Sequence, residues 1–212
     1  MNIVLLGAPG AGKGTQAELL VQKLGIPSIS TGNMLRDAMK QGTETGKKAQ
    51  YYMDNGLLVP DDVVLGIVAD RVAMSDCAQG FILDGFPRTI AQAQALEESG
   101  IRIDHVISIE VDDCVIEGRM TGRRVCSACG ASYHVEANPP KTTGKCDLCG
   151  SELVTRDDDV PEKVRTRLTV YHSKTEPLKD FYQGLGKLRL VNGNQPIVTI
   201  SQDIFGVIGA KE

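Results

Sequence analysis

The sequence has no excess of positive charge and no long apolar segment. Its 212 residues include 23 Lys and Arg against 27 Asp and Glu, a formal net charge of -4. A negative chain has no bulk attraction for phosphate backbones, which argues against general nucleic-acid binding. No apolar run approaches the roughly 20 residues that cross a bilayer, and residues 1–10 contain no basic leader. We therefore expect a cytoplasmic protein with neither nucleic acid nor a membrane as its partner.

The sequence is also poor in candidate general bases. It has three histidines, His105, His134 and His172, which are scattered along the chain, and no glutamate stands out as a catalytic base. A reaction whose attacking group is already an anion needs no such base. The sequence contains no internal repeat, no low-complexity tract and no sign of a dimer seam. We therefore expect a monomer with one substantial core.

Short apolar runs alternate with helical patterns along most of the chain. The runs predict buried strands at residues 2–6, 80–84, 105–111, 187–191 and 196–200. Helical patterns occupy residues 12–25, 31–42, 61–72, 89–99, 112–124 and 160–184, with a last helix after residue 200 and a loop at 51–60. This alternation favours an α/β fold in which a parallel sheet is covered on both faces.

The stretch GAPGAGKG at residues 7–14 fits the phosphate-binding pattern GxxxxGK. Its glycines allow backbone N–H groups to turn inward around phosphate oxygens, and Lys13 adds positive charge toward the outer phosphates. The helix that follows adds the positive end of its dipole. A merely flexible glycine-rich turn is the alternative. The preceding strand and the following helix favour the phosphate loop.

The residue after Lys13 departs from that pattern. Gly14 stands where Ser or Thr is usual, and Thr15 follows. The hydroxyl that normally binds Mg²⁺ is therefore displaced by one position. We expect magnesium to be held loosely, through Thr15, water and Asp84 at the end of its strand. A plain strand-ending turn is the alternative role for Asp84.

Four cysteines form a C-x₂-C-x₁₆-C-x₂-C pattern, namely Cys126, Cys129, Cys146 and Cys149. This spacing is typical of a tetrahedral zinc site, and Gly130 and Gly150 allow the tight turn after each pair. Four thiolates fill the coordination sphere, so the metal is expected to be structural. The segment between the pairs has one aromatic residue, Tyr133, and only two basic residues, which favours a structural staple over a nucleic-acid site. Cys77 and Cys114 stand alone and are interpreted as core or surface residues.

Several arginines lie beside glycine, proline or loop residues: Arg36, Arg88, Arg119, Arg123, Arg156 and Arg167. Solvated surface positions are the ordinary interpretation of such residues. If two phosphorylated nucleotides meet head to head, however, a ring of guanidinium groups can hold their converging charges. Phosphoryl transfer needs little beyond such alignment and neutralisation, and an acceptor phosphate needs no general base.

Six separated segments resemble the adenylate kinase family, in order and along almost the whole chain: GAPGAGKGTQA, STGNMLR, NGLLVPDD, FILDGFPRT, GRMTGRR and RDDDVPEKVRTRL. The resemblance is to the long-lid bacterial type with a four-cysteine zinc site. It implies a three-layer P-loop fold whose core comprises residues 1–29, 60–121 and 160–212. It also implies a helical nucleoside-monophosphate-binding insertion at 30–59 and a lid at 122–159. The implied reaction converts Mg-ATP and AMP reversibly into two ADP, with lid closure excluding water.

The resemblance also implies residue roles. ATP would be bound by Gly10, Ala11, Gly12, Lys13, Gly14, Thr15, Arg119, Arg123, Ser132, Tyr133 and, through its backbone, Gln195. AMP would be bound by Thr31, Arg36, Leu57, Leu58, Val59, Gly85, Phe86, Pro87, Arg88, Gln92, Arg156 and Arg167. Catalysis would rest on Lys13, Arg88, Arg123, Arg156, Arg167, Asp158 and Asp159.

The acidic run at residues 157–159 has two interpretations. Asp159 and Glu162 have the spacing of a capping box, and Pro161 suits the first turn of a helix. The resemblance instead places Asp158 and Asp159 beside the arginines as positioning groups. Both interpretations stay open at this stage.

Two rival functions remain. A kinase for another nucleoside monophosphate is the alternative within enzymes, because base choice depends on few contacts, among them Gln92 and residues 57–59. A zinc-ribbon nucleic-acid binder is the alternative from another class.

Overall fold

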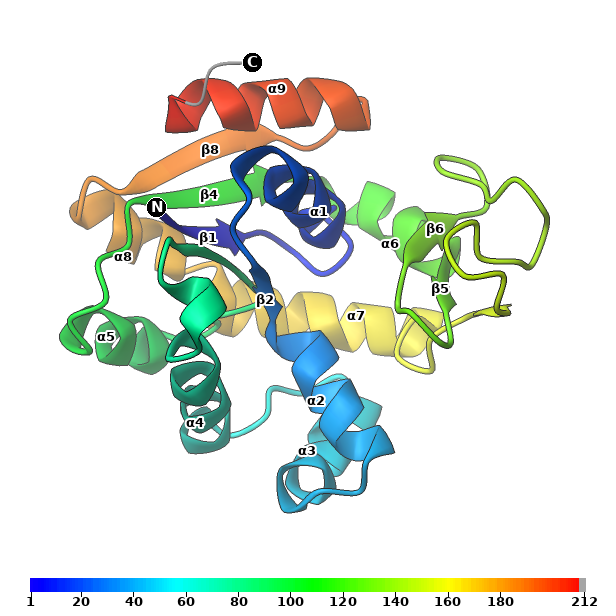
Figure 1. Cartoon of the computed structure of the whole chain (residues 1–212), viewed down its shortest axis with the longest axis horizontal. Helices are drawn as coiled ribbons and strands as arrows, with labels where there is room; N and C mark the ends of the chain where they lie inside the picture. Colours follow the sequence, from blue (N-terminus) through cyan, green and yellow to red (C-terminus); the bar gives the residue numbers. More distant parts are fainter. Residues whose placement is uncertain (210–212) are drawn as a thin grey trace.

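The central element is a five-stranded sheet in which all neighbouring strands run parallel (Figure 1). The computed structural model describes residues 1–209. From one edge to the other, the sheet consists of β2 (Ser28–Ser30), β3 (Phe81–Asp84), β1 (Asn2–Leu6), β4 (His105–Glu110) and β8 (Leu188–Asn192). The four predicted strands at 2–6, 80–84, 105–111 and 187–191 are thereby confirmed, and the short edge strand β2 was not predicted.

Helices cover both faces of the sheet. Alternate residues of β1 show the division, because Ile3 and Leu5 belong to one buried cluster whereas Val4 and Leu6 belong to another. The first cluster contains side chains of α1 (Lys13–Leu24), α6 (Asp113–Thr121), α7 (Pro161–Val170) and α9 (Ile197–Ile208). The second contains side chains of α2 (Thr31–Lys40), α3 (Glu44–Asp54), α4 (Asp61–Val72), α5 (Ile90–Glu98) and α8 (Leu178–Gly184). This is the three-layer arrangement expected from the sequence.

Two short elements complete the helical layers: the 3₁₀ turn η1 (Ser75–Cys77) and the π-turn η2 (Tyr171–Thr175) between α7 and α8. None of the helices within residues 1–209 combines the length and apolar character that crossing a membrane requires.

The segment 31–54 projects from the core as a pair of packed helices, α2 and α3. Residues 51–60 were expected to form a loop, and α3 was not predicted. The reason is local: α3 begins after Thr43, whose hydroxyl accepts the N–H of Gly46, and its exposed face is too polar to give a clear apolar stripe. Gly46 meets α2 closely, since a Cβ there would lie 2.2 Å from the carbonyl oxygen of Ala38.

The predicted strand at residues 196–200 is wrong. Pro196 caps α9, and Ile197 is already the first residue of that helix. The buried residues Ile200, Ile204 and Ile208 follow a four-residue period, which places them on one helical face toward α1. The β-branched run therefore favoured a strand locally, but burial of one helical stripe decided the outcome.

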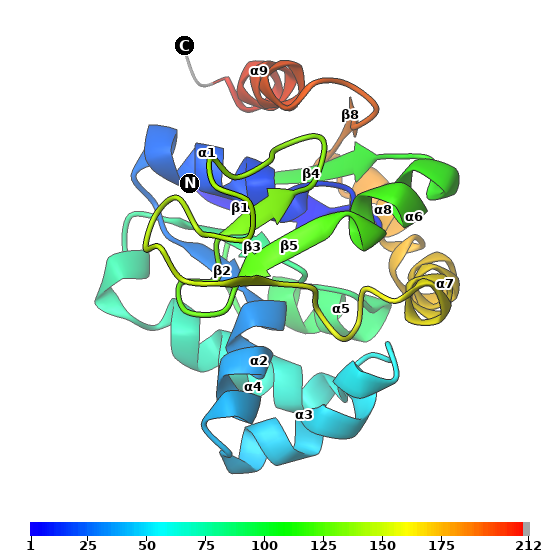
Figure 2. The ribbon, with the colours of Figure 1, turned by 90° about the vertical axis from the view of Figure 1, so that its right-hand side faces the viewer.

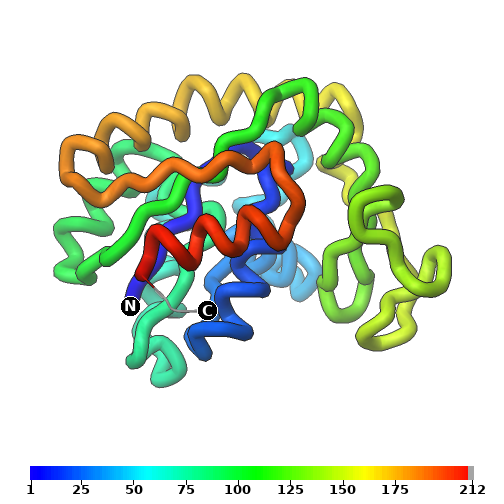
Figure 3. The backbone as a smooth tube through the Cα atoms, turned by 90° about the horizontal axis from the view of Figure 1, so that it is seen from above, coloured from blue at the N-terminus to red at the C-terminus, as the bar shows by residue number. Residues whose placement is uncertain are grey.

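The segment 122–159, which the resemblance implies is a lid and which is called the lid below, contains a small antiparallel sheet formed by β6 (Ser132–His134), β5 (Arg123–Cys126) and β7 (Leu153–Val154). Seen from above, it forms a lobe at one end of the molecule (Figure 3). The helix expected at 112–124 ends at Thr121, because the chain turns into β5 there. Figure 2 shows β5 leading away from α6 and the lid loops lying in front of the main sheet.

Candidate active site

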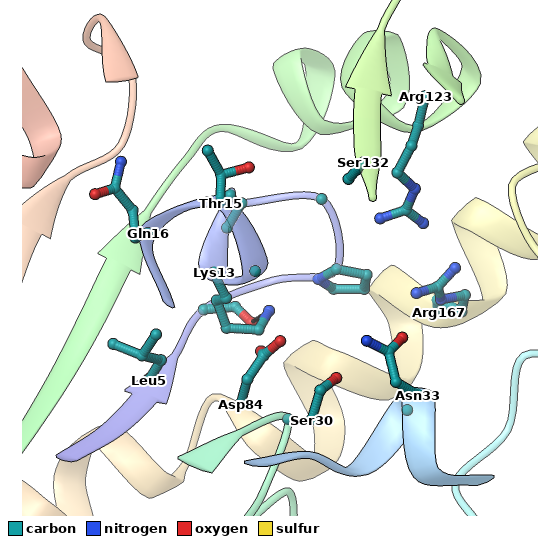
Figure 4. Close-up of a pocket in the computed structure, with 18 of the residues that line it drawn as sticks. Leu5, Lys13, Thr15, Gln16, Ser30, Asn33, Asp84, Arg123, Ser132 and Arg167 are labelled. Carbon is teal, nitrogen blue, oxygen red and sulfur yellow. Dashed lines mark hydrogen bonds between the residues drawn. The ribbon is translucent and has the colours of Figure 1, made fainter. Parts of the chain in front are cut away.

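A cavity of about 610 Å³ lies between the core, the α2–α3 insertion and the lid. It opens where the loop after β1 leaves the sheet. In the sheet, β1 lies between β3 and β4. Ligands of open parallel sheets bind at such a switch in strand order. Figure 4 shows side chains from all three regions facing this space.

The loop after β1 has a backbone that only glycine tolerates at several positions. Gly7, Gly10 and Gly12 have φ values of 138°, 82° and 99°. A Cβ on Gly7 would also lie 2.6 Å from the carbonyl oxygen of Ile109. The loop leads directly into α1, so its N–H groups and the helix N-terminus lie at the cavity. This is the geometry that binds phosphate groups.

Lys13 lies at the centre of this loop. Its ammonium donates hydrogen bonds to the carbonyl oxygens of Gly7 (2.7 Å) and Ala8 (2.8 Å). Burial lowers the pKa of Lys13 to about 8, helped by the nearby arginines and opposed by Asp84. The Lys13 and Asp84 side chains point toward each other in Figure 4. A phosphate anion in the cavity would stabilise the charged form of this lysine.

Asp84 ends β3 and lines the cavity beside the phosphate loop. A Cβ on Gly14 would lie 3.8 Å from its Oδ2 atom, and Thr15 also lines the cavity. Oxygen ligands on this side could hold a hydrated Mg²⁺ that accompanies a nucleotide. The structure therefore fits the interpretation of Asp84 as more than a turn former.

Arginines from the lid and from α7 converge opposite the loop. Arg123 binds the buried carboxylate of Asp159 through both oxygens, with 2.7 Å from Nε to Oδ2. Arg167 reaches the same carboxylate at 3.3 Å and Asp158 at 2.9 Å. Both guanidinium groups face the cavity in Figure 4.

Asp158 and Asp159 therefore contact arginines. Within residues 1–209, Asp159 does not line the cavity, and α7 is capped by Val160 without a side-chain hydrogen bond. The capping-box interpretation of Asp159 is wrong, because its carboxylate is occupied by Arg123 and Arg167. Burial alone would raise the pKa of Asp158, but Arg167 and the other arginines outweigh it, so the pKa is lowered.

Besides Arg119, which is described below, three further arginines line the same cavity, namely Arg36, Arg88 and Arg156. Burial lowers the pKa of each, and repulsion from neighbouring arginines adds to the effect. A guanidinium stays protonated at neutral pH despite such shifts. Their mutual repulsion is instead relieved when an anion binds between them.

The α2–α3 side of the cavity contains the residues expected to bind AMP. Thr31 donates its hydroxyl to the carbonyl oxygen of Gly85 at 2.8 Å, and Arg88 Nε donates to the same oxygen at 2.8 Å. Residues 57–59, Pro87 and Gln92 also line the cavity. Phe86 does not line it, because its side chain is 1% exposed and belongs to the core.

The opposite side contains the residues expected to bind ATP. Arg119 donates to the carbonyl oxygen of Gly193 at 2.8 Å, which ties α6 to the loop before α9. The Gln195 side chain is turned toward Asn192 and Asp203, so its contribution to the cavity comes from other atoms. Ser132 lines the cavity from the lid.

Comparisons with known proteins agree with this geometry. A family model described as adenylate kinase matches residues 5–187. Curated relatives named adenylate kinase include those of Desulforamulus reducens (55% identical, covering 97% of this chain and 98% of the relative) and Lachnoclostridium phytofermentans (53%, covering 99% and 98%). The relative from Caldicellulosiruptor bescii is 54% identical over 100% of both chains.

The chain belongs to the adenylate kinase family. The family, the fold class and the enzyme expected from the sequence are thereby confirmed. The assignment of individual residues to ATP, AMP and the transferred phosphoryl group remains a prediction, supported, except for Phe86 and Asp159, by their position around one cavity.

The four cysteines of this adenylate kinase lid lie together. Their sulfur atoms are all within 4.8 Å of one another, with 3.4 Å between Cys126 and Cys149 and 3.6 Å between Cys129 and Cys146. Tetrahedral zinc with bonds of about 2.3 Å separates its sulfur ligands by about 3.8 Å. The thiol set and its geometry therefore fit a structural zinc ion.

Tyr133 takes part in this cluster more than in the cavity. It is buried in the small lid core, and its hydroxyl accepts the N–H of Asp147 at 2.8 Å and lies 3.5 Å from Cys146 Sγ. Its aromatic side chain thus supports the turn that carries Cys146 and Asp147, and contact with ATP would come from its other atoms. His134 is not part of the four-sulfur group.

Sequence reasoning missed several polar residues at the cavity. Asn33 accepts a hydrogen bond from Arg36 at 2.9 Å, and Thr175 donates to the carbonyl oxygen of Arg88 at 2.9 Å. Asn33 lies in the quoted STGNMLR motif, three residues before Arg36, and that helical spacing was the available signal. Thr175 belongs to η2 and lies 87 residues from its partner Arg88, so no local sequence pattern could indicate this contact.

Proposed function

We propose that this chain transfers the γ-phosphoryl group of Mg-ATP to AMP and forms two ADP, reversibly. The observation that carries the proposal is the convergence of Lys13 with five arginines on one cavity of about 610 Å³, namely Arg36, Arg88, Arg123, Arg156 and Arg167. No described residue of this cavity is needed as a general base, because the acceptor is a phosphate that is already ionised. The adenylate kinase relatives have the same activity in their name.

In this proposal the two nucleotides enter from opposite sides. ATP takes the phosphate loop and the side of Arg119 and Ser132, while AMP takes the side of Thr31, Gly85 and Gln92. The arginines neutralise the phosphates that meet between them, and Asp158 and Asp159 hold Arg123 and Arg167 in position. Mg²⁺, when bound with ATP, neutralises charge on the phosphate oxygens.

The finer features of the proposal follow from the same arrangement. The core comprises residues 1–29, 60–121 and 160–212, of which 210–212 lie outside the described residues. The monophosphate-binding insertion comprises residues 30–59, and the lid comprises residues 122–159. Closure of the lid excludes water, which would otherwise compete as acceptor. The four cysteines bind one structural zinc ion that stabilises the lid. We expect a cytoplasmic monomer that binds neither nucleic acid nor membranes.

The experiment is a coupled assay for ADP formation from Mg-ATP, with and without AMP, on protein of measured zinc content. Strong AMP-dependent turnover with one zinc per chain supports the proposal. Equal ADP formation without AMP would identify a hydrolase and remove the second nucleotide site. Replacing AMP by GMP, CMP or UMP tests the alternative acceptors, and retardation of nucleic acid in a salt-dependent gel shift tests the zinc-ribbon alternative.

A further inference from the structure

Two hydrogen bonds fix which way the amide of Gln92 points. Gln92 lies in the first turn of α5, lines the cavity and is 2% exposed. Its Oε1 accepts the backbone N–H of Arg88 at 2.7 Å, and its Nε2 donates to Oδ1 of Asp61 at 2.7 Å. A backbone N–H can only donate, and an ionised carboxylate can only accept. Both partners therefore favour the same orientation of the amide.

Asp61 is itself held in place. It starts α4, and its second oxygen, Oδ2, accepts the hydroxyl of Thr89 at 3.0 Å. The Thr89 oxygen in turn accepts the N–H of Gln92 at 3.1 Å and caps α5. Asp61, Thr89 and Gln92 thus close a ring of hydrogen bonds between two helix N-termini. Asp61 lies outside the lining of the cavity, so any effect on a ligand passes through Gln92.

The fixed orientation has a consequence for base recognition. A glutamine amide has two N–H donors and two lone pairs, and the bonds to Arg88 and Asp61 use one of each. The remaining lone pair can accept from an exocyclic amino group, and the remaining N–H can donate to a ring nitrogen. A 6-aminopurine offers this amino donor beside an unprotonated N1. A 6-oxopurine offers the reverse, an oxygen acceptor beside an N1–H donor.

A 6-oxopurine would need the amide of Gln92 turned over. That rotation would place Nε2 against the N–H of Arg88 and Oε1 against the carboxylate of Asp61. The first contact opposes two donors and the second opposes two acceptors, and leaving buried polar groups unpaired is costly. The backbone N–H of Arg88 cannot be changed by substitution, but the carboxylate of Asp61 can.

We propose that Asp61 is a positioning residue that sets the base preference of the acceptor site by holding Gln92 in the orientation that recognises a 6-aminopurine. The inference rests on the proposed function, in which Gln92 contacts the base of the acceptor nucleotide. The hydrogen bond from Gln92 to Asp61 fixes which atoms of the Gln92 amide can donate to and accept from the base.

The test replaces Asp61 by asparagine, which has nearly the same shape but can donate as well as accept. The values of kcat/KM are measured with AMP and with IMP, whose base differs at position 6 and at N1. In Asp61→Asn we expect the AMP-to-IMP ratio to fall by about tenfold or more, the scale expected for one buried hydrogen bond. The KM for ATP should stay unchanged, because ATP is bound elsewhere in the cavity.

Asp62→Asn is the matched control. Asp62 is the next residue in the same first turn of α4, is exposed, and carries the same charge near the helix N-terminus. Its removal changes the helix-dipole interaction as Asp61→Asn does but leaves Gln92 untouched. The AMP-to-IMP ratio of this variant should equal that of the unchanged chain.

Thr89→Val distinguishes the effect of the Asp61 carboxylate on base preference from the effect of the α5 cap on stability. This variant removes the hydroxyl that Asp61 and Gln92 share but keeps the Asp61–Gln92 bond. It should melt at a lower temperature and keep the base preference. If Asp61→Asn does not fold, Asp61→Ser supplies a smaller group that can also donate, and the same fall in the ratio is expected.

Four outcomes would overturn the inference. They are an equal ratio in Asp61→Asn and Asp62→Asn, an equal loss with AMP and IMP in Asp61→Asn, a collapse of the ratio in Thr89→Val, and an unchanged chain that does not prefer AMP over IMP. In each of these the unchanged chain still shows AMP-dependent turnover, so the proposed phosphoryl transfer stands. Absence of AMP-dependent turnover in the unchanged chain would instead overturn the proposed function.

Discussion

The core and the lid solve the same problem of stability in different ways. The core buries apolar side chains on both faces of a parallel sheet, with Ile3, Val4, Ile82 and Val106 at 0% exposure. The buried cluster of the lid has only Cys126, Tyr133, Cys146 and Leu153. Each fully buried aliphatic side chain contributes about 1.5–3 kcal/mol, so the lid lacks the material to fold by apolar burial alone. The zinc ion proposed for the four cysteines would supply the folding free energy that this small cluster lacks.

Removal of the Lys13 charge should have the largest effect on turnover and none on the lid. We expect Lys13→Ala to lower kcat/KM by on the order of 10³-fold, because a buried positive charge opposite the transferred phosphate is lost. Zinc content should change little, and the melting temperature should not fall, because the desolvated charge of Lys13 costs folding free energy at neutral pH.

Lys23→Ala provides the control, since Lys23 is exposed in the last turn of the same helix. Loss of zinc together with loss of turnover in Lys13→Ala would contradict the division between core and lid.

Loss of one thiolate should have the opposite effect: it should lower the stability of the lid and largely spare turnover. We expect Cys129→Ser to lower the free energy of unfolding of the lid by on the order of 3 kcal/mol, because metal binding and lid folding are coupled. Turnover at low temperature should be largely spared, since a zinc ion held by four thiolates has no open position for substrate. Zinc analysis, thermal melting and turnover at two temperatures measure this.

Cys114→Ser, at an exposed cysteine on α6 outside the cluster, should leave all three quantities unchanged. An inactive Cys129→Ser enzyme at low temperature would mean that the metal supports the chemistry directly.

The pH dependence of kcat/KM should report the protonation of Lys13. Burial lowers the pKa of Lys13 to about 8, so the empty enzyme loses this charge above that pH. The value of kcat/KM for Mg-ATP reports the free enzyme and should fall toward tenfold per pH unit above about pH 8. The value of kcat should persist to higher pH, because bound phosphates favour the ammonium.

The same pKa predicts the sign of the stability change. The folded chain releases the Lys13 proton at lower pH than the unfolded chain, so this lysine makes the free energy of unfolding rise with pH between about 8 and 10.5. Identical pH profiles for kcat and kcat/KM would show that Lys13 is not the titrating group.

The smallest expected effect concerns the core alone. Tyr182 is 0% exposed, and its hydroxyl has no hydrogen-bond partner among residues 1–209. Tyr182→Phe removes this unpaired group and should stabilise the protein by about 1 kcal/mol, or raise Tm by about 2–4 °C. Tyr51→Phe, at a residue 66% exposed, should leave Tm unchanged. A lower Tm in Tyr182→Phe would mean that a bound water pairs with the hydroxyl.

Local sequence was most informative where one short segment contains all the residues that a binding site needs. The phosphate loop needs glycines and Lys13 within eight residues, and the four-cysteine cluster needs two CxxC pairs, so both could be predicted without the fold. Sequence reasoning was weakest where two interpretations share one pattern. The run at 196–200 is β-branched yet helical, and Asp159 has cap spacing yet binds Arg123 and Arg167.

The sequence by itself determined the family, the alternation of strands and helices, and the residue types that gather around phosphate and zinc. These depend on local backbone chemistry and on side chains close together in the chain. Only the tertiary structure decided which carboxylates hold which arginines, that the Tyr133 hydroxyl lies at the cysteine cluster, and that Asp61 is hydrogen-bonded to Gln92 from 31 residues away. Those contacts join separate elements, and the packing of helices on the sheet fixes them, so no spacing within one segment could reveal them.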